Sequence, residues 1–327
     1  MYSLKRVFSL LALILLLGYF AVAGPVPSTL LAQGRVDDAI VSLQGQLNSA
    51  PNDGESHLLL CRAYFDMGKW DVGIDACQKA VSLDAGNSRY HMWLGRIYGE
   101  KAENSNFLTA GRLAKKVREE FETAVRLDPK SAEARTDLAE FYIEAPGIMG
   151  GGKDKAAQQA QQLARFDPVK AAWVYARIAE KQGDFAAAEK TYRSAASGNS
   201  GQAEAWVNLA RFYRNRGRFD EMAEAIQQLN AGATGKPEEL VNAAQVVIRS
   251  GQHTALAAQL LRRYLSSSPT VEEAPVFKVH YLLGTLLEQQ GDRQGAAQEY
   301  RAALALARNF SPAQNALDRV SRQPAGL

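Results

Sequence analysis

The feature of this sequence that most constrains its fold is a repeat with a period of 34 residues. When the chain is shifted by this length, residues of the same type coincide at several positions. Four pairs coincide: His57 with His91, Leu60 with Leu94, Arg62 with Arg96, and Tyr64 with Tyr98. Such a period is typical of helix pairs that stack and bury their apolar faces against their neighbours. We therefore predict an all-α solenoid rather than a single globular core.

The clearest unit of the repeat runs from Gly54 to about Gly86 and is expected to contain two helices. In each half the apolar residues follow the i, i+3, i+4, i+7 spacing of an amphipathic helix. The first stripe comprises His57, Leu60, Cys61 and Tyr64, and the second comprises Trp70, Ile74, Cys77, Ala80 and Val81. Gly68 is expected to end the first helix, because glycine readily adopts the left-handed conformation found after helix C-termini.

With this period, the sequence resembles the tetratricopeptide repeat family, whose signature is W-x2-L-G-x2-Y, then A-x3-F, then P. The matching residues are Leu94, Gly95, Tyr98, Phe121, Ala124 and Pro129, and again Trp206, Leu209, Ala210 and Tyr213. Two further stretches, Gly183–Ala195 and Gly291–Leu304, match the second helix of the family. The resemblance covers most of residues 30–308. It implies a right-handed α-solenoid of helix-turn-helix repeats whose first helices line the concave face.

The repeats are predicted to form an array over residues 54–308, with about seven units. Residues 24–53 are expected to form an N-terminal cap with a partial repeat, and residues 309–327 a C-terminal capping helix and tail. Two insertions interrupt the register, near residues 100–112 and 145–153. Insertions in a solenoid usually form loops on one edge, close to the working surface.

Residues 1–23 have the pattern of a targeting segment. Lys5 and Arg6 precede an apolar run from residue 7 to residue 23, which ends in the small residues of a cleavage site. We expect cleavage after Ala23. The alternative is an uncleaved membrane anchor, because this run approaches the ~17–25 residues that span a bilayer. The protein is accordingly expected to be exported, as a periplasmic or secreted protein or one held at the inner membrane by residues 7–23.

The chain has two cysteines, Cys61 and Cys77. The 34-residue register places them on the two antiparallel helices of one repeat, and an exported protein meets an oxidising environment in which disulfides persist. A disulfide requires that their Cα atoms lie within about 7 Å. The alternative is a pair of small buried apolar side chains, since free cysteine packs well in cores. The sequence leaves both open.

Charge and residue types exclude several classes of function. Lys and Arg number 38 against 35 Asp and Glu, so the near-neutral chain has no general attraction for nucleic acid. His57, His91 and His280 occupy equivalent places in different repeats, too far apart to bind one zinc ion, and a packing role is expected. We find no catalytic constellation, and so predict a protein that is not an enzyme and needs no cofactor or metal.

The segment Gly147–Lys153 matches G-x4-G-K, the first part of a phosphate-binding loop. Asp154 stands where that motif has Ser or Thr to hold Mg²⁺, and its charge would repel phosphate. The segment also follows a helical pattern rather than a buried strand. A glycine-rich loop between helices is the favoured interpretation, and nucleotide binding is the alternative.

Arginines recur near the small-residue position of the predicted first helices, and so on the expected concave face. They are Arg62, Arg96, Arg177 and Arg211, with Arg214 one turn beyond Arg211 on the same face. Guanidinium groups in such a row can bind the carboxylates of an acidic peptide through paired hydrogen bonds. Trp173 is a candidate apolar anchor beside them. The alternative is that these arginines pair with Glu55, Glu180 and Glu204 of the array itself or remain solvated.

These observations predict a non-catalytic scaffold that binds a protein or peptide partner in the concave groove. If the arginines are free, the partner is expected to be acidic. A role as an assembly or chaperone-like factor in the cell envelope fits the export signal. The alternative function is nucleotide binding by the Gly147–Lys153 loop.

Overall fold

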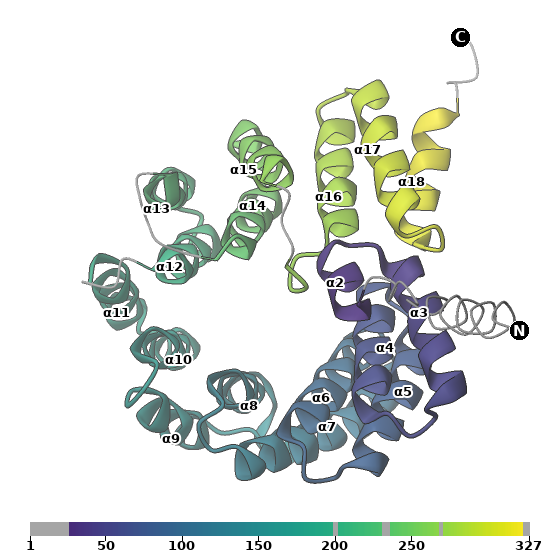
Figure 1. The fold of residues 1–327 in the computed structure, drawn as a ribbon. Coiled ribbons are helices and arrows are strands. Elements are labelled where there is room, and N and C mark those ends of the chain that lie inside the picture. Colours follow the sequence, from purple (N-terminus) through teal and green to yellow (C-terminus); the bar gives the residue numbers. More distant parts are fainter. Residues whose placement is uncertain (1–25, 199–201, 231–235, 268–270, 323–327) are drawn as a thin grey trace, which may run out of the picture.

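The computed structural model describes residues 26–198, 202–230, 236–267 and 271–322, and every regular element in these ranges is helical (Figure 1). The expected signal peptide or anchor, residues 1–23, lies outside the described residues. Among the helices that are described, none is long and apolar enough to cross a membrane.

Within the described residues, the helices from α4 to α17 form seven pairs, each an antiparallel helix-turn-helix (Figure 1). The pairs are α4 (Gly54–Asp66) with α5 (Trp70–Leu83), α6 (Ser88–Glu103) with α7 (Phe107–Leu127), α8 (Ala132–Glu144) with α9 (Lys153–Leu163), α10 (Pro168–Gln182) with α11 (Phe185–Ser197), α12 (Ala203–Asn215) with α13 (Phe219–Asn230), α14 (Glu238–Ser250) with α15 (Thr254–Ser266), and α16 (Val276–Gln289) with α17 (Arg293–Leu306). The short α2 (Pro27–Ala32) and α3 (Val36–Ser49) precede them, and α18 (Ser311–Ser321) follows. The all-α solenoid of helix-turn-helix repeats predicted from the period is confirmed.

Local sequence signals set the helix ends. Gly68 and Gly183 follow α4 and α10 with φ angles of 67° and 78°, a conformation that only glycine adopts without strain. At the other end, side-chain oxygens accept hydrogen bonds from the first free backbone N–H groups of many helices. These caps include Asp53, Asn87, Asn106, Ser131, Asp167, Asp184 and Asp292. The ends of these helices therefore follow from the residues that occupy the turns.

The two helices of a pair approach most closely where the first helix carries a small residue. Gly95 of α6 lies against Phe121 of α7, and a Cβ atom at position 95 would come within 2.5 Å of the Phe121 ring. Gly284 of α16 faces Tyr300 of α17 in the same way, at 2.6 Å. The glycine of the repeat signature therefore makes room for the aromatic ring of the partner helix.

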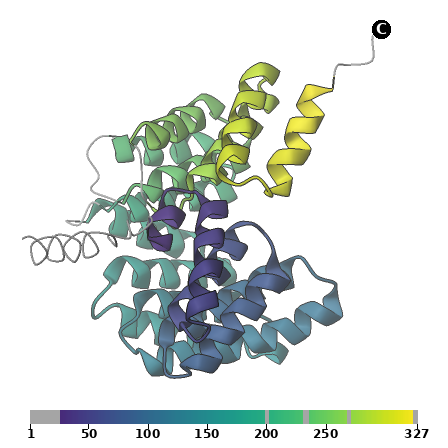
Figure 2. The same ribbon diagram turned by 45° about the vertical axis from the view of Figure 1, so that its right-hand side comes forward.

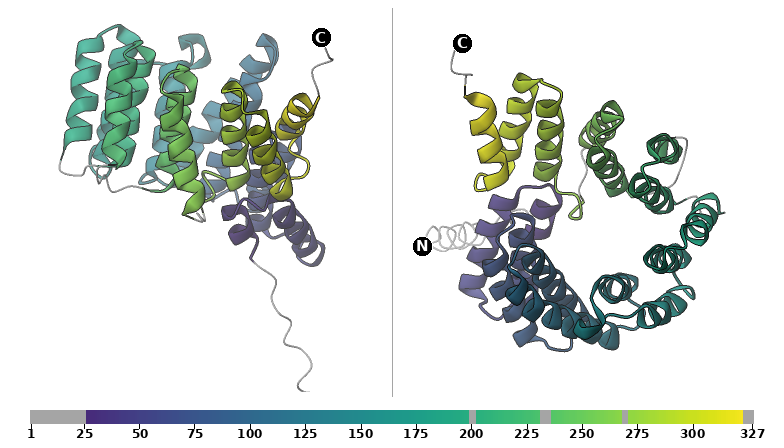
Figure 3. Two further views of the ribbon diagram at one scale, coloured as in Figure 1. Left: turned by 90° about the horizontal axis from the view of Figure 1, so that it is seen from above. Right: turned by 180° about the vertical axis from the view of Figure 1, so that it is seen from behind.

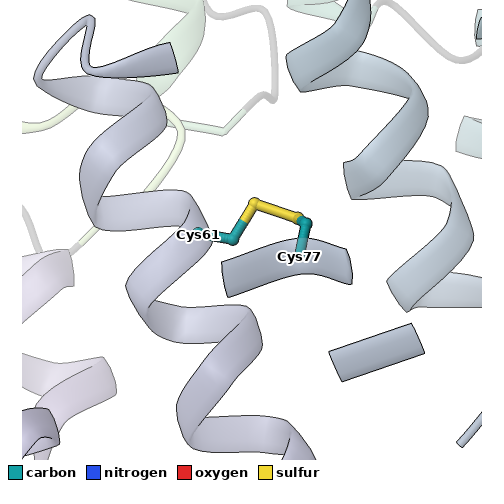
Figure 4. The surroundings of a disulfide bond; sticks show 2 residues. All are labelled: Cys61 and Cys77. Atoms are coloured by element: carbon teal, nitrogen blue, oxygen red, sulfur yellow. A yellow bond between two sulfur atoms is a disulfide. The ribbon is translucent and has the colours of Figure 1, made fainter. Parts of the chain in front are cut away.

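In the first pair, a disulfide joins Cys61 of α4 to Cys77 of α5 (Figure 4). The two Cα atoms are 5.2 Å apart, and both side chains are fully buried. Of the two alternatives that the sequence left open, the structure has the bridge.

The two insertions take different forms. The first was expected to be a loop, but α6 continues to Glu103 and α7 begins at Phe107, so most of it lengthens these two helices. This is because Asn106 caps a new helical start and accepts a hydrogen bond from the Thr109 N–H group. The second insertion is a loop with one turn of 3-10 helix, η1 (Gly147–Met149).

The helix pairs follow a curved path, with α8, α10, α12 and α14 on its inside and α9, α11, α13 and α15 on its outside (Figure 1; Figure 3, right panel). The first helices thus form an inner face.

The path returns to its start, because α16 and α17 pack against α2, α3 and α4 (Figures 1 and 2). Phe277 and Phe310 share one apolar cluster with Leu30 and Val36. In addition, Lys278 Nζ lies 2.7 Å from Asp66 Oδ1, across 212 residues of sequence. The two ends of the solenoid therefore close into a ring.

Candidate functional site

The inner face of the ring carries two adjoining pockets, which together we call the inner groove. One, of about 330 Å³, is lined by residues of α6, α8, α10, α12 and α14. The other, of about 380 Å³, lies between α4, α6, α7 and α8 and has apolar walls that include Phe65 and Phe141. Arg96, Asp137 and Glu140 are close to both pockets, and Arg96 and Glu140 line each of them. The inner groove therefore offers charged and apolar walls along several consecutive repeats.

Two of the predicted arginines are held by partners within the chain. The guanidinium groups of Arg62 and Arg96 lie 4.7 and 4.9 Å from the ring centroid of Trp93. Arg62 also pairs with Glu272, in the segment that leads into α16. Arg96 Nε lies 2.6 Å from Asp137 Oδ2, and a second Arg96 nitrogen lies 3.3 Å from Glu133. Burial by itself would lower the pKa of Arg96, but Asp137 and Glu133 outweigh it and raise this pKa.

Arg177 of α10 is also paired. Its guanidinium lies 2.6 Å from Glu144 and 3.3 Å from Glu180. Burial alone would lower its pKa, but these carboxylates, with Tyr192, outweigh burial and raise it. Trp173, one turn earlier, is only 9% exposed and packs in the main apolar core, while its edge reaches the wall of the inner groove. Neither side chain stands free for a ligand in this state.

The remaining predicted arginines, Arg211 and Arg214, form a positive group with Arg249, which was not predicted. Within the described residues, no carboxylate oxygen forms an ion pair with Arg211, Arg214 or Arg249, which we call the arginine cluster. Arg211 donates to Asn208 Oδ1 at 3.4 Å, and Arg214 donates to Asn215 Oδ1 at 2.6 and 3.2 Å. Burial, and then the positive charges of Arg249 and Arg211, lower the pKa of Arg214. Repulsion among the three charges would fall on binding an anion.

Carboxylates of the inner groove lie near this cluster. Burial raises the pKa of Glu140, and the neighbouring Asp137 raises it further, while Arg177 and Arg211 partly oppose the change. Burial likewise raises the pKa of Glu239 on α14. The groove therefore has both signs of charge. Of the arginine cluster, Arg211 lines the groove itself, as Arg96 and Lys170 do.

The sequence placed the first helices on the inner face and offered Glu180 as a partner, with which Arg177 does pair. It did not reveal the partners of Arg62 and Arg96. Their partners come from neighbouring repeats at variable spacing, so no single period shows them. Trp93 and Arg249 were not predicted as site residues. Trp93 had a usable signal, because it stands three residues before Arg96 and so shares its helix face. Arg249 also had one, because it is the twelfth residue of α14, as Arg214 is the twelfth residue of α12.

The glycine-rich loop Gly147–Lys153 uses its own backbone N–H groups internally. The N–H groups of Met149, Gly150, Gly151 and Gly152 all donate to carbonyl oxygens of the same loop or of α8, at 2.8–3.2 Å. The loop follows α8 rather than a strand. Phosphate-binding loops instead point such groups at the ligand. The geometry thus favours a structural loop.

The histidines do not converge on a metal. Among the described residues there is no group of three or more His, Cys, Asp or Glu side chains that could hold an ion. His91 Nδ1 lies 2.6 Å from Glu120, and His280 Nδ1 lies 2.6 Å from Glu299. His57 lies 3.0 Å from the carbonyl oxygen of Pro51. These rings therefore bond to polar groups of their own repeats, in addition to the packing that the sequence suggested.

A curved stack of helix pairs with a grooved inner face defines a class of proteins that bind other proteins. Two sequence models described as tetratricopeptide repeat match this chain. One matches residues 30–98 and 179–245, and the other matches residues 148–203 and 242–313, so that together they cover most of the chain. The protein belongs to the tetratricopeptide repeat family.

Relatives share parts of the chain or its fold. Cellulose synthase operon protein C of Pseudomonas fluorescens (strain SBW25) is 29% identical over 179 residues, which cover 53% of this chain but only 13% of that protein. Among solved structures, yeast Tom70 is similar, with a TM-score of 0.51 and 16% identity over 87% of this chain and 58% of that chain. A tetratricopeptide repeat protein from Thermus thermophilus has a TM-score of 0.45 and 20% identity, over 55% of this chain and 91% of that chain.

Proposed function

We propose that this protein is a non-catalytic scaffold whose inner groove binds an acidic segment of a partner protein. The observation that carries this proposal is the arginine cluster. Arg211 lines the inner groove, and the charges of Arg211 and Arg249 act on Arg214. None of the three forms an ion pair with a carboxylate among the described residues. Carboxylates of a bound segment would supply the missing partners through charge-assisted hydrogen bonds.

The rest of the groove supports an extended ligand. The pocket beside Phe65 and Phe141 has room for an apolar side chain, several repeats away from the arginine cluster. Arg62, Arg96 and Arg177 are neutralised by the protein itself, so they shape the groove rather than attract the partner. The likeness to cellulose synthase operon protein C supports a scaffold built from repeats. It spans too little of that protein to suggest more.

A binding experiment can test the arginine cluster. The probe is a fluorescein-labelled hexaglutamate peptide, followed by fluorescence anisotropy at about 50 mM salt, where screening is weak. We expect Arg211→Gln/Arg214→Gln/Arg249→Gln to weaken binding by roughly tenfold or more, because each lost charged hydrogen bond contributes about 1.5–3 kcal/mol. A hexaglutamine peptide should not bind.

The matched control removes the same charge elsewhere. Arg165, Arg262 and Arg301 are exposed and lie outside the inner groove. Their triple substitution to Gln should leave the affinity within about twofold. If both triple variants weaken binding equally, the attraction is general and the proposed site is wrong.

We also infer that the protein acts in the cell envelope. The basic start and apolar run of residues 5–23 resemble an export signal. The bridge between Cys61 and Cys77 fits an oxidising compartment, where such bonds persist. N-terminal sequencing of the protein from cells tests this inference. A first residue of Gly24 is expected, and an intact N-terminus together with reduced cysteines would contradict export.

A further inference from the structure

The two insertions that interrupt the repeats meet on one surface of the protein. Met149 of η1 reaches Gly111 in the second turn of α7, where a Cβ atom would lie 3.7 Å from the Met149 methyl carbon. Arg118 of α7 donates to the Met149 carbonyl oxygen at 3.3 Å. The lengthened start of α7 and the glycine-rich loop therefore form one continuous surface.

This surface carries the most exposed large apolar side chains of the described residues. Phe107 is 89% exposed, Leu108 is 76% exposed and Ile148 is 94% exposed, whereas the next most exposed, Val41, reaches 64%. Phe107 and Leu108 lie one turn before Gly111, and Ile148 directly precedes Met149. We call these three side chains, with Met149, the insertion patch. Clustered apolar side chains that project into solvent usually mark a contact surface.

Basic residues surround the insertion patch. Residues 104–118 include four basic and no acidic residues, and residues 145–155 include two basic and one acidic. The exposed basic side chains of these two stretches are Arg112, Lys115, Lys116, Lys153 and Lys155. Lys116 Nζ lies 4.9 Å from the centroid of the Tyr98 ring, and Lys155 Nζ lies 5.3 Å from that of Tyr142. Lys115 has a weak partner in Glu119 at 3.8 Å, and Lys155 donates to the Gly150 carbonyl oxygen at 3.0 Å. Asp154, Glu103 and Glu119 offset only part of the positive charge of these five side chains.

We propose that the insertion patch docks on the surface of an anionic lipid bilayer. Phe107, Leu108 and Ile148 would enter the boundary between headgroups and acyl chains, and the surrounding lysines and arginines would stay among the headgroups. A bilayer is favoured over a protein partner because the three apolar side chains project almost fully into solvent. Long basic side chains beside them can reach anionic headgroups.

Hydrogen–deuterium exchange of the full chain can test this proposal. Vesicles of phosphatidylglycerol and phosphatidylcholine in equal amounts are the probe, and vesicles of phosphatidylcholine alone are the comparison. We expect the mixed vesicles to slow exchange at least about threefold in residues 104–112 and 145–152, with a smaller effect from neutral vesicles. High salt should reduce the effect, since it screens the attraction of the basic residues for the headgroups.

Matched variants separate the insertion patch from other membrane contacts. Phe107→Ser/Leu108→Ser/Ile148→Ser should abolish the slowing, while Val41→Ser/Val72→Ser, which changes exposed residues of α3 and α5, should preserve it. All variants share the N-terminus of the wild-type protein, so differences between them report the patch alone. Equal exchange in the two segments with and without vesicles would overturn the proposal, as would equal protection by neutral vesicles.

Discussion

At the scale of single residues, a glycine of the first helix packs against an aromatic ring of the second helix in two of the pairs. In one other pair, the disulfide takes the place of this contact. Gly284 faces Tyr300, 16 residues later, and Cys61 is bonded to Cys77 at the same separation. Cys61 also stands 34 residues before Gly95, which makes the glycine contact in the next unit. The sulfur bridge therefore occupies the place of a small-residue contact with an aromatic ring.

The bridge should stabilise the first repeats measurably. Replacing both cysteines with alanine opens a loop of about 16 residues, for which the chain-entropy account gives a loss of roughly 3 kcal/mol. Urea unfolding followed by circular dichroism measures this loss as a lower midpoint. Dithiothreitol should lower the midpoint of the wild-type protein to that of the double variant and leave the variant unchanged. A reductant-insensitive wild type would contradict this expectation.

The same scale shows what the sequence could predict of the site. The period placed Arg96 and Arg211 on the inner face, because one period of 34 residues returns a helix to the same orientation. It could not show that Asp137 neutralises Arg96 while no carboxylate among the described residues pairs with Arg211. That difference depends on side chains of adjacent repeats, whose distances are set only by packing.

At the scale of helices, the repeat signature predicted close packing correctly, whereas the form of the first insertion was predicted wrongly. The loop was inferred from the break in register, but Asn106 caps a helix that begins within the inserted residues. A break in period therefore signals extra length and does not by itself distinguish a loop from a longer helix. The segment from Gly147 was predicted more successfully, because glycine and proline oppose helix formation.

Two glycines of α6 should respond oppositely to substitution. A Cβ atom at Gly95 would come within 2.5 Å of Phe121, while one at Gly99 would meet nothing within 4 Å. Both changes to alanine gain the same helix propensity of about 0.5–1 kcal/mol. Gly95→Ala should nevertheless be less stable than Gly99→Ala by about 1–3 kcal/mol, because the Phe121 ring must move. Thermal unfolding of the two variants measures the difference, and equal stabilities would show that the ring adapts freely.

At the scale of the whole molecule, the closed ring is the feature that the sequence did not reveal. Each repeat pattern concerns neighbours, and the same repeats are compatible with an open superhelix. Closure depends on contacts between residues far apart in the chain, such as Lys278 with Asp66 and Arg308 with Asp37, which are 212 and 271 positions apart. Closure also contributes residues to the inner face. In the segment before α16, Glu272 pairs with Arg62 and Glu273 lines the inner groove.

The ring contact should control the stability of the N-terminal cap. The helix α2 has only six residues, too few to persist alone in water, so it depends on packing against Phe277 and its neighbours. Lys278→Glu would place a carboxylate against Asp66, and burial already raises the pKa of Asp66. We therefore expect hydrogen exchange in α2 to accelerate at least about tenfold. Adding Asp66→Lys should restore slow exchange by re-forming the pair in reverse. Lys101→Glu breaks a more exposed ion pair, with Asp71 inside the array, and should leave exchange in α2 unchanged. Unaltered exchange in Lys278→Glu would show that the ends are held by apolar contacts alone.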